Sequence, residues 1–228
     1  FGSSFTSLPF SLLQPAGGMP LDIEEDKAPP LEDEDSDGDE QPVFWDDKVA
    51  LEKMRRTDEW KNLYRLVQTD GLALRDAPPE MLGDREMVAE ACWENGMALQ
   101  YAPAEMQADW EIVACAVTKS GGSLLYASTD LRNDRSIVLK AVAESGGSLE
   151  YASEALRADR EVVLTAVRQR GMALRYASDE LRGDPEIVKV AARQSRRALM
   201  YASERLKRDP KFVKEASSQP PILTSRYE

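Results

Sequence analysis

Apolar residues recur along this chain in a helical pattern that repeats every 25 residues. In one repeat Val162, Val163, Ala166 and Val167 stand at i, i+1, i+4 and i+5, which is one face of an α-helix. The pattern predicts a helix of about eleven residues, Arg160 to Arg170 in this repeat. Equivalent apolar pairs occur at Ile112-Val113, Ile137-Val138, Ile187-Val188 and Phe212-Val213.

The rest of each repeat carries a second, shorter apolar pattern. Ala173, Leu174, Ala177 and Leu181 predict a helix over Met172–Leu181, with a break near Ser178 left open. Neither helix can bury its apolar stripe alone, whereas stacked repeats bury a continuous core. We therefore expect an all-α fold, an α-solenoid of about six stacked two-helix repeats over residues 48–216, with units starting near residues 51, 76, 101, 126, 151, 176 and 201.

An aspartate and a glycine mark the two ends of the longer helix. The aspartates precede it as N-caps, and two of them are followed by a proline, which suits the first helical position. The glycines follow the helix, where we expect the left-handed C′ conformation. The aspartates stand one per layer, about 8–10 Å apart, so capping explains them better than metal binding. The positions are Asp84, Asp109, Asp134, Asp159, Asp184 and Asp209, and Gly96, Gly121, Gly146 and Gly171.

A tyrosine followed by alanine also recurs once per repeat. Stacking on bases or pigments is one use for such a row. Because the residue is the same in every repeat, packing between repeats is the better interpretation, with the hydroxyl bonded to a neighbouring turn. The row consists of Tyr101, Tyr126, Tyr151, Tyr176 and Tyr201.

Together these positions read A-L-x-Y-A-S-x-x-L-R-x-D-x-x-I-V-x-x-A-V. This motif resembles the tandem helical repeats, about 25 residues long, of a family of unknown function that is abundant in algae and other single-celled eukaryotes. The resemblance covers about residues 58–216. It implies the repeat architecture and no particular chemistry. Arg196 departs from it where glycine is expected, which leaves the turn at residues 194–197 open.

The charge of −12 belongs to the N-terminal segment and not to the repeats. Residues 1–47 hold thirteen acids and one base, and the remaining residues balance. This composition predicts a disordered-type acidic extension. Its apolar residues are candidate anchors for a partner: Phe5, Phe10, Leu12, Leu13, Phe44 and Trp45. Residues 217–228 form a C-terminal tail.

Several kinds of chemistry are excluded by composition. Histidine is absent, which removes the usual nucleophilic triads and most zinc sites. Cys92 and Cys115 form no C-x-x-C pair, and a reduced pair of small core residues is favoured over a disulfide. No apolar run approaches the ~20 residues of a membrane-spanning helix. We expect no catalytic residue, no cofactor and no metal, and therefore no enzyme.

Binding in a solenoid normally uses the positions at which repeats differ. Trp93 and Trp110 replace polar residues of other repeats, as exposed anchors or as edge packing. Basic residues concentrate in residues 166–216, with 13 bases against 7 acids. The candidates there are Arg168, Arg170, Arg193 and Arg197, and an acidic protein surface or the chain's own acidic segment fits them. Nucleic acid is not expected, because these arginines lack interleaved aromatics.

We therefore interpret the chain as a non-enzymatic protein–protein interaction or scaffold subunit of a larger assembly. A free soluble adaptor that binds partners transiently is the alternative, and a nucleic-acid-binding repeat protein is a weaker one. The start at Phe1 resembles the processing site of proteins imported into complex algal plastids. It favours a plastid membrane complex such as a photosynthetic one, with this subunit peripheral to the membrane, although a fragmentary sequence explains the start equally well.

Overall fold

The computed structural model describes residues 48–218, and every regular element in that range is helical. Seven longer helices follow the opening helix α1 (Lys48–Arg55). They are α2 (Asp58–Val67), α4 (Arg85–Glu94), α6 (Trp110–Lys119), α8 (Arg135–Glu144), α10 (Arg160–Gln169), α12 (Pro185–Gln194) and α14 (Pro210–Ser218). The expected all-α solenoid is confirmed.

Two short elements connect each longer helix to the next. The first is a 3₁₀ helix: η2 (Gly71–Asp76), η3 (Gly96–Tyr101), η4 (Gly121–Tyr126), η5 (Gly146–Tyr151), η6 (Gly171–Tyr176) and η7 (Arg196–Tyr201). The second is a single α-helical turn: α3 (Pro79–Leu82), α5 (Ala104–Gln107), α7 (Thr129–Arg132), α9 (Glu154–Arg157), α11 (Asp179–Arg182) and α13 (Glu204–Lys207).

The second helix expected in each repeat is thus broken in two, at the place that the sequence left open. Ala177 and Ser178 are extended between η6 and α11. The backbone N–H of Ser178 donates to the carbonyl of Arg157 in the preceding repeat, at 3.0 Å. An N–H used across the stack cannot also continue a helix, so the chain bends here. Its hydroxyl then caps α11 by accepting from the N–H of Leu181.

The aspartates cap the longer helices as predicted. Asp159 accepts from the backbone N–H groups of Glu161 and Val162, at 2.8 and 3.0 Å. The first layer uses another cap: α2 begins at Asp58 and is capped by Thr57, whose hydroxyl accepts from the N–H of Trp60. The side chain of Trp60 is buried in the core of this first layer.

The prediction of left-handed glycines is wrong. No described residue has positive φ, and the residue after α10, Arg170, is extended. The glycines are needed for close packing instead: a Cβ on Gly171 would lie 2.3 Å from the carbonyl oxygen of Ala191 in the next layer. Arg196, which stands at the glycine position of the next repeat, is exposed and still begins η7. Its guanidinium donates to the carbonyl of Ser217 at 2.8 Å.

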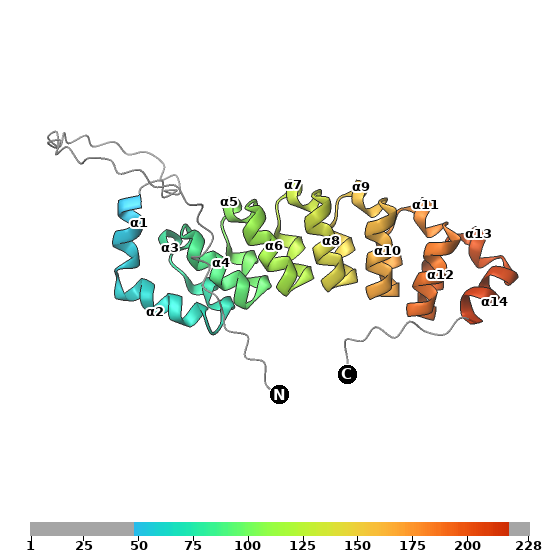
Figure 1. Cartoon of the computed structure of the whole chain (residues 1–228), viewed down its shortest axis with the longest axis horizontal. Helices are drawn as coiled ribbons and strands as arrows, with labels where there is room; N and C mark the ends of the chain where they lie inside the picture. Colours follow the sequence, from blue (N-terminus) through green and yellow to red (C-terminus); the bar gives the residue numbers. More distant parts are fainter. Residues whose placement is uncertain (1–47, 219–228) are drawn as a thin grey trace, which may run out of the picture. The chain divides into compact units, whose positions relative to one another are not determined.

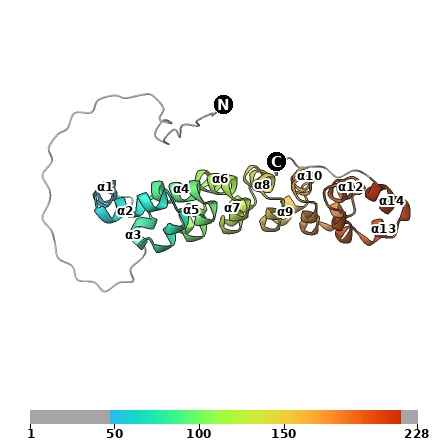
Figure 2. The same cartoon turned by 90° about the horizontal axis from the view of Figure 1, so that it is seen from below.

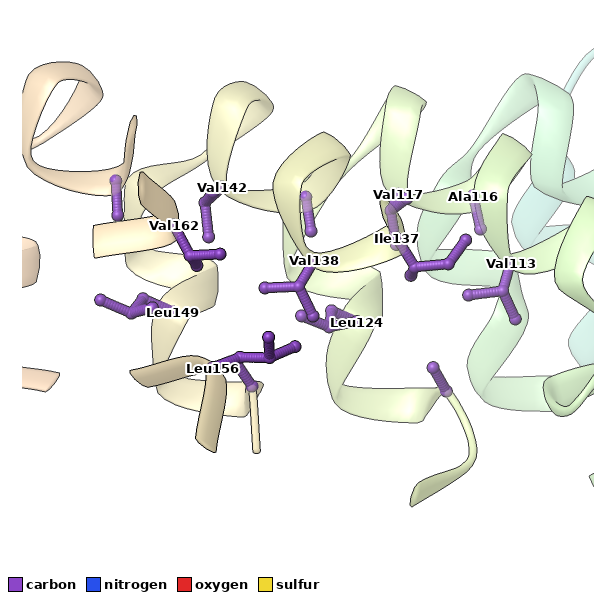
Figure 3. Packing of buried hydrophobic residues seen from close by; sticks show 14 of the residues in the cluster. Val113, Ala116, Val117, Leu124, Ile137, Val138, Val142, Leu149, Leu156 and Val162 are labelled. Carbon is purple, nitrogen blue, oxygen red and sulfur yellow. The ribbon is translucent and has the colours of Figure 1, made fainter. Parts of the chain in front are cut away.

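The longer helices α4, α6, α8, α10 and α12 lie side by side in Figure 1, and each of the seven longer helices contacts the next. Figure 2 shows the one-turn helices along one side of this row, and the 3₁₀ helices contact one another in the same order. The core runs between these rows. Val113, Ile137, Val138 and Val162 project from successive helices toward Leu124 and Leu149 of the 3₁₀ row (Figure 3). Each fully buried aliphatic side chain stabilises the stack by about 1.5–3 kcal/mol.

The repeated tyrosines are packing residues, in agreement with the prediction. All five are half-buried against the core. The Tyr126 hydroxyl faces the Gln100 side-chain oxygen of the preceding repeat at 3.4 Å, whereas the Tyr176 hydroxyl accepts from Arg175 within its own repeat. The expected bond to a neighbouring repeat is therefore present for Tyr126 and not for Tyr176.

Candidate interaction surfaces

One class of arginine forms ion pairs between successive layers of the solenoid. Arg135, the first residue of α8, contacts the capping Asp159 of the next layer at 3.0 Å and Glu161 at 2.5 Å. Arg85 makes the same pairs with Asp109 and Glu111, at 2.8 and 2.5 Å. These contacts form a ladder of ion pairs between layers, which was not predicted from the sequence. The sequence signal for these pairs is an arginine followed by acids 24 and 26 residues later, one repeat further along the chain.

The pKa values of the capping aspartates Asp109 and Asp159 are lowered by hydrogen bonds from the backbone and from the ladder arginines. Backbone N–H donation from Val162, aided by Arg135, holds the pKa of Asp159 below its ordinary value. Burial would raise the pKa of Asp109, but hydrogen bonds from Arg85 and from the backbone N–H of Ile112 outweigh it and lower that pKa. Both caps therefore carry a charge at neutral pH.

Trp110 interrupts this ladder. It is the first residue of α6, the position that arginine holds in α4 and α8, and 45% of its surface is exposed. In the next layer Ser136 stands where the other ladder steps have glutamate, and its hydroxyl donates to Asp134 at 2.6 Å. This hydrogen bond lowers the pKa of Asp134. Trp110 is therefore an exposed indole at a position that normally joins two layers.

Trp93 is the second exposed tryptophan, at 59%. The ammonium of Lys119, from the next layer, lies 4.3 Å from the centre of its ring, a cation–π contact. Both tryptophans are exposed, and Trp93 also packs against a neighbouring layer, so their role as anchors for a partner stays a prediction.

Trp93 belongs to a row of equivalent positions in the last turn of the longer helices. The row changes character along the stack, from aromatic through small to basic. Its members are Trp93, Thr118, Ala143, Arg168 and Arg193. Because equivalent residues of packed layers are neighbours, this row is one continuous strip of variable surface.

Six basic residues lie in the layers at the basic end of this row, and we call them the arginine edge: Arg168 and Arg193 of the row itself, with Arg170, Arg175, Arg196 and Arg197. All are exposed except Arg193, which is half-buried. Arg168 and Arg193 lie in the last turns of α10 and α12, where a cation complements the helix dipole. None of the six makes an ion pair within residues 48–218. They differ in this from the ladder arginines.

A small, shallow pocket, a depression of about 40 Å³, lies beside the arginine edge. It is lined by Gly147 of η5, by Arg170, and by Met172, Arg175 and Tyr176 of η6. The Arg175 guanidinium lies 4.3 Å from the Tyr176 ring centre. A Cβ on Gly147 would approach the Arg170 guanidinium to 3.3 Å, so the glycine leaves room for this side chain. The pocket therefore presents two guanidinium groups at one point of the surface.

Two glutamines tie together the layers that carry the arginine edge. The Gln169 side chain accepts from the N–H of Gly146 at 2.6 Å and donates to the carbonyl of Glu144 at 3.2 Å. Gln194 repeats the first bond with Gly171, also at 2.6 Å. These bonds occupy polar groups at the helix ends of α8 and α10 and fix the layers relative to one another.

The six candidate anchors Phe5, Phe10, Leu12, Leu13, Phe44 and Trp45 lie outside the described residues. Cys92 and Cys115 are free thiols, and burial raises the pKa of both, that of Cys92 to about 12, so neither is activated as a nucleophile.

The described part of the chain lacks two further kinds of site. It holds no cluster of three or more acidic or cysteine side chains arranged to bind a metal ion. None of its helices has the length and apolar content that a bilayer crossing requires.

The fold and these surfaces define a tandem-repeat α-solenoid. The family described as a domain of unknown function (DUF4116) matches residues 63–107, 84–132, 109–157 and 159–207, and the chain belongs to this family. No curated protein and no solved structure matches the chain. The resemblance inferred from the repeat motif is thereby confirmed as membership of a tandem repeat family.

Proposed function

We propose that this chain is a non-enzymatic interaction scaffold that holds a protein partner within a larger assembly. The observation that carries the proposal is the contrast between two sets of arginines. Those at the start of α4, α8 and α10 pair with acids of the next layer. Those of the arginine edge have no acidic partner among the described residues, although residues 166–216 carry a net charge of +6.

Charges of one sign that lack an acidic partner repel one another. A partner of opposite charge relieves this repulsion, steers the encounter and selects against other proteins. The glutamine bonds beneath the edge support the same proposal, because a surface held in fixed geometry loses little conformational entropy on binding.

The N-terminal segment has a place in this proposal as a second contact. Residues 1–47 carry the whole net charge of −12 and six large apolar side chains suited to anchoring. An extended segment covers much partner surface but loses ordering entropy on binding, so such anchors are necessary. Deleting residues 1–47 should weaken association while the helical stack remains folded.

Native purification of the tagged full-length chain tests the proposal. We expect to recover the chain in a stoichiometric complex with other protein subunits. Identifying those subunits also tests the expectation of a plastid complex. Recovery of the chain alone, at physiological salt and without cross-linking, would contradict the scaffold function and favour a transient adaptor.

A matched pair of variants connects that complex to the surface. Arg168→Glu with Arg193→Glu and Arg197→Glu reverses three charges of the arginine edge. Lys53→Glu with Arg65→Glu and Lys140→Glu reverses three exposed charges on α1, α2 and α8. We expect the first variant to leave the complex and the second to remain in it.

A further inference from the structure

We propose that the arginine edge binds an acidic protein segment in the polyproline II conformation, with a carboxylate at every third position. This inference rests on the proposed scaffold function and specifies the chemistry of the partner. It combines three features of the described residues: the charge of the edge, the spacing of its arginines and the pocket beside it.

The spacing of the arginines gives the conformation of the partner. Arg168 and Arg193 hold the same position in α10 and α12, which pack directly against each other. Packed helices lie about 8–10 Å apart. A polyproline II segment has three residues per turn and a rise of 3.1 Å, so it presents the same face about every 9 Å. Carboxylates at every third residue therefore meet one arginine per layer, whereas the two-residue period of a β-strand, about 7 Å, does not match the layers.

The pocket can bind one carboxylate of such a segment and so fix the position of the segment on the edge. Arg170 is two residues from Arg168 along the chain and shares the pocket with Arg175. Two guanidinium groups at one pocket suit a single carboxylate, since arginine donors match carboxylate oxygens in pairs. Gly147 keeps this pocket open, and Met172 gives it an apolar wall.

Other anionic partners fit the edge less well. The aromatic ring in the pocket, Tyr176, has the Arg175 guanidinium over one face, so that face is closed to a nucleic-acid base. Peripheral membrane binding combines basic residues with apolar side chains that enter the lipid. Among residues 166–216 the exposed large hydrophobic side chain is Met200 alone, at 61%. A protein segment uses the charges without needing either feature.

Fluorescence anisotropy of the full-length chain tests the proposal with two labelled synthetic peptides. One is built of Glu-Ala-Pro triplets, which favour polyproline II and place glutamate at every third position. The other has the same composition with all glutamates at one end. We expect the triplet peptide to bind about tenfold more tightly, because only its charges match the layers.

Variants then locate the site. Arg168→Glu with Arg193→Glu should weaken binding of the triplet peptide at least tenfold, and Arg170→Ala with Arg175→Ala should weaken it severalfold. If charge reversal alters the circular dichroism of the helices, the milder variant Arg168→Gln with Arg193→Gln replaces it in the binding experiment. The Lys53→Glu, Arg65→Glu, Lys140→Glu variant should bind as the unaltered chain does.

Equal binding of the two peptides would show that the carboxylates need not stand at every third residue. Binding unaffected by the arginine variants would show that the arginine edge is not the binding site. Tighter binding of single-stranded oligonucleotide or of anionic lipid vesicles would overturn the class of partner. These failures are separate from failure of the scaffold function. A chain that stays in its native complex but shows no preference between peptides keeps the function and loses this inference.

Discussion

Gly121 of η4 faces the carbonyl oxygen of Ala141 in α8 so closely that a Cβ on the glycine would lie 2.3 Å from that oxygen. The same approach recurs at Gly71, Gly96, Gly146 and Gly171, each against the alanine of the next layer, at 2.2–2.3 Å. Contact between the start of a 3₁₀ helix and the last turns of the following long helix therefore sets the distance between layers.

This contact predicts opposite outcomes for two adjacent glycines. Gly121→Ala should destabilise the fold by about 3 kcal/mol, because the carbonyl belongs to a packed helix and cannot move away. Gly122→Ala should leave stability unchanged or raise it by up to about 1 kcal/mol, because the nearest atom to its Cβ is a serine hydroxyl at 3.9 Å. Chemical denaturation of both variants measures this, and equal effects would contradict the packing account.

The ranking of cap and core is a second prediction. Asp159→Ala removes two backbone hydrogen bonds at the start of α10 and should cost about 1 kcal/mol. Leu156→Ala opens a cavity in the core shown in Figure 3 and should cost about 2–4 kcal/mol. Thermal melts that rank the two in the opposite order would show that Leu156 does not contribute to the core as described.

Stability should fall in acid. The pKa values of Asp109, Asp134 and Asp159 are lower in the folded chain than the ordinary value of about 3.9. Their charged forms therefore stabilise the fold fully above that value, and the contribution is lost as pH falls below it through the folded pKa values. The midpoint of urea unfolding, followed from pH 6 down to about pH 2, measures this. Asp159→Asn should show a smaller loss in acid than the unaltered chain, and an equal loss would contradict the assignment.

How much of this could be derived from sequence depended on whether a feature is local. The core positions and the aspartate caps follow from spacing within one helix, and they were predicted correctly. The break at Ser178 and the role of Gly171 depend on groups in neighbouring layers, the carbonyls of Arg157 and Ala191. Neither partner is visible in the sequence of a single repeat.

The candidate surfaces show the same division. The sequence marked Trp93, Trp110 and Arg168 as variable positions, because they differ from their equivalents in other repeats, but for the tryptophans it left exposed anchor and edge packing open. All three are exposed in the structure. The pocket and the glutamine bonds were not predictable, since they need the geometry between η5 and η6 and between successive helix ends. Six of the predicted anchors lie in residues 1–47, outside the described residues, and their role in binding stays a prediction.

The interrupted step of the ladder can be repaired by design. Trp110→Arg with Ser136→Glu restores the pattern that Arg85 makes with Asp109 and Glu111. Because these pairs are partly exposed, we expect a gain of at most about 1 kcal/mol, larger for the double variant than for the sum of the single ones. Additive effects in a double-mutant cycle would show that the ladder does not couple the layers.

Chemical labelling of arginines with a phenylglyoxal reagent, read by mass spectrometry, tests the central claim most directly. The chain is labelled once alone and once within its native complex. The scaffold account predicts that Arg168, Arg175 and Arg193 lose reactivity in the complex, while Arg56 and Arg65, exposed on the first layers, keep theirs. Unchanged reactivity across the arginine edge, with protection elsewhere, would show that the partner is held by another face of the molecule.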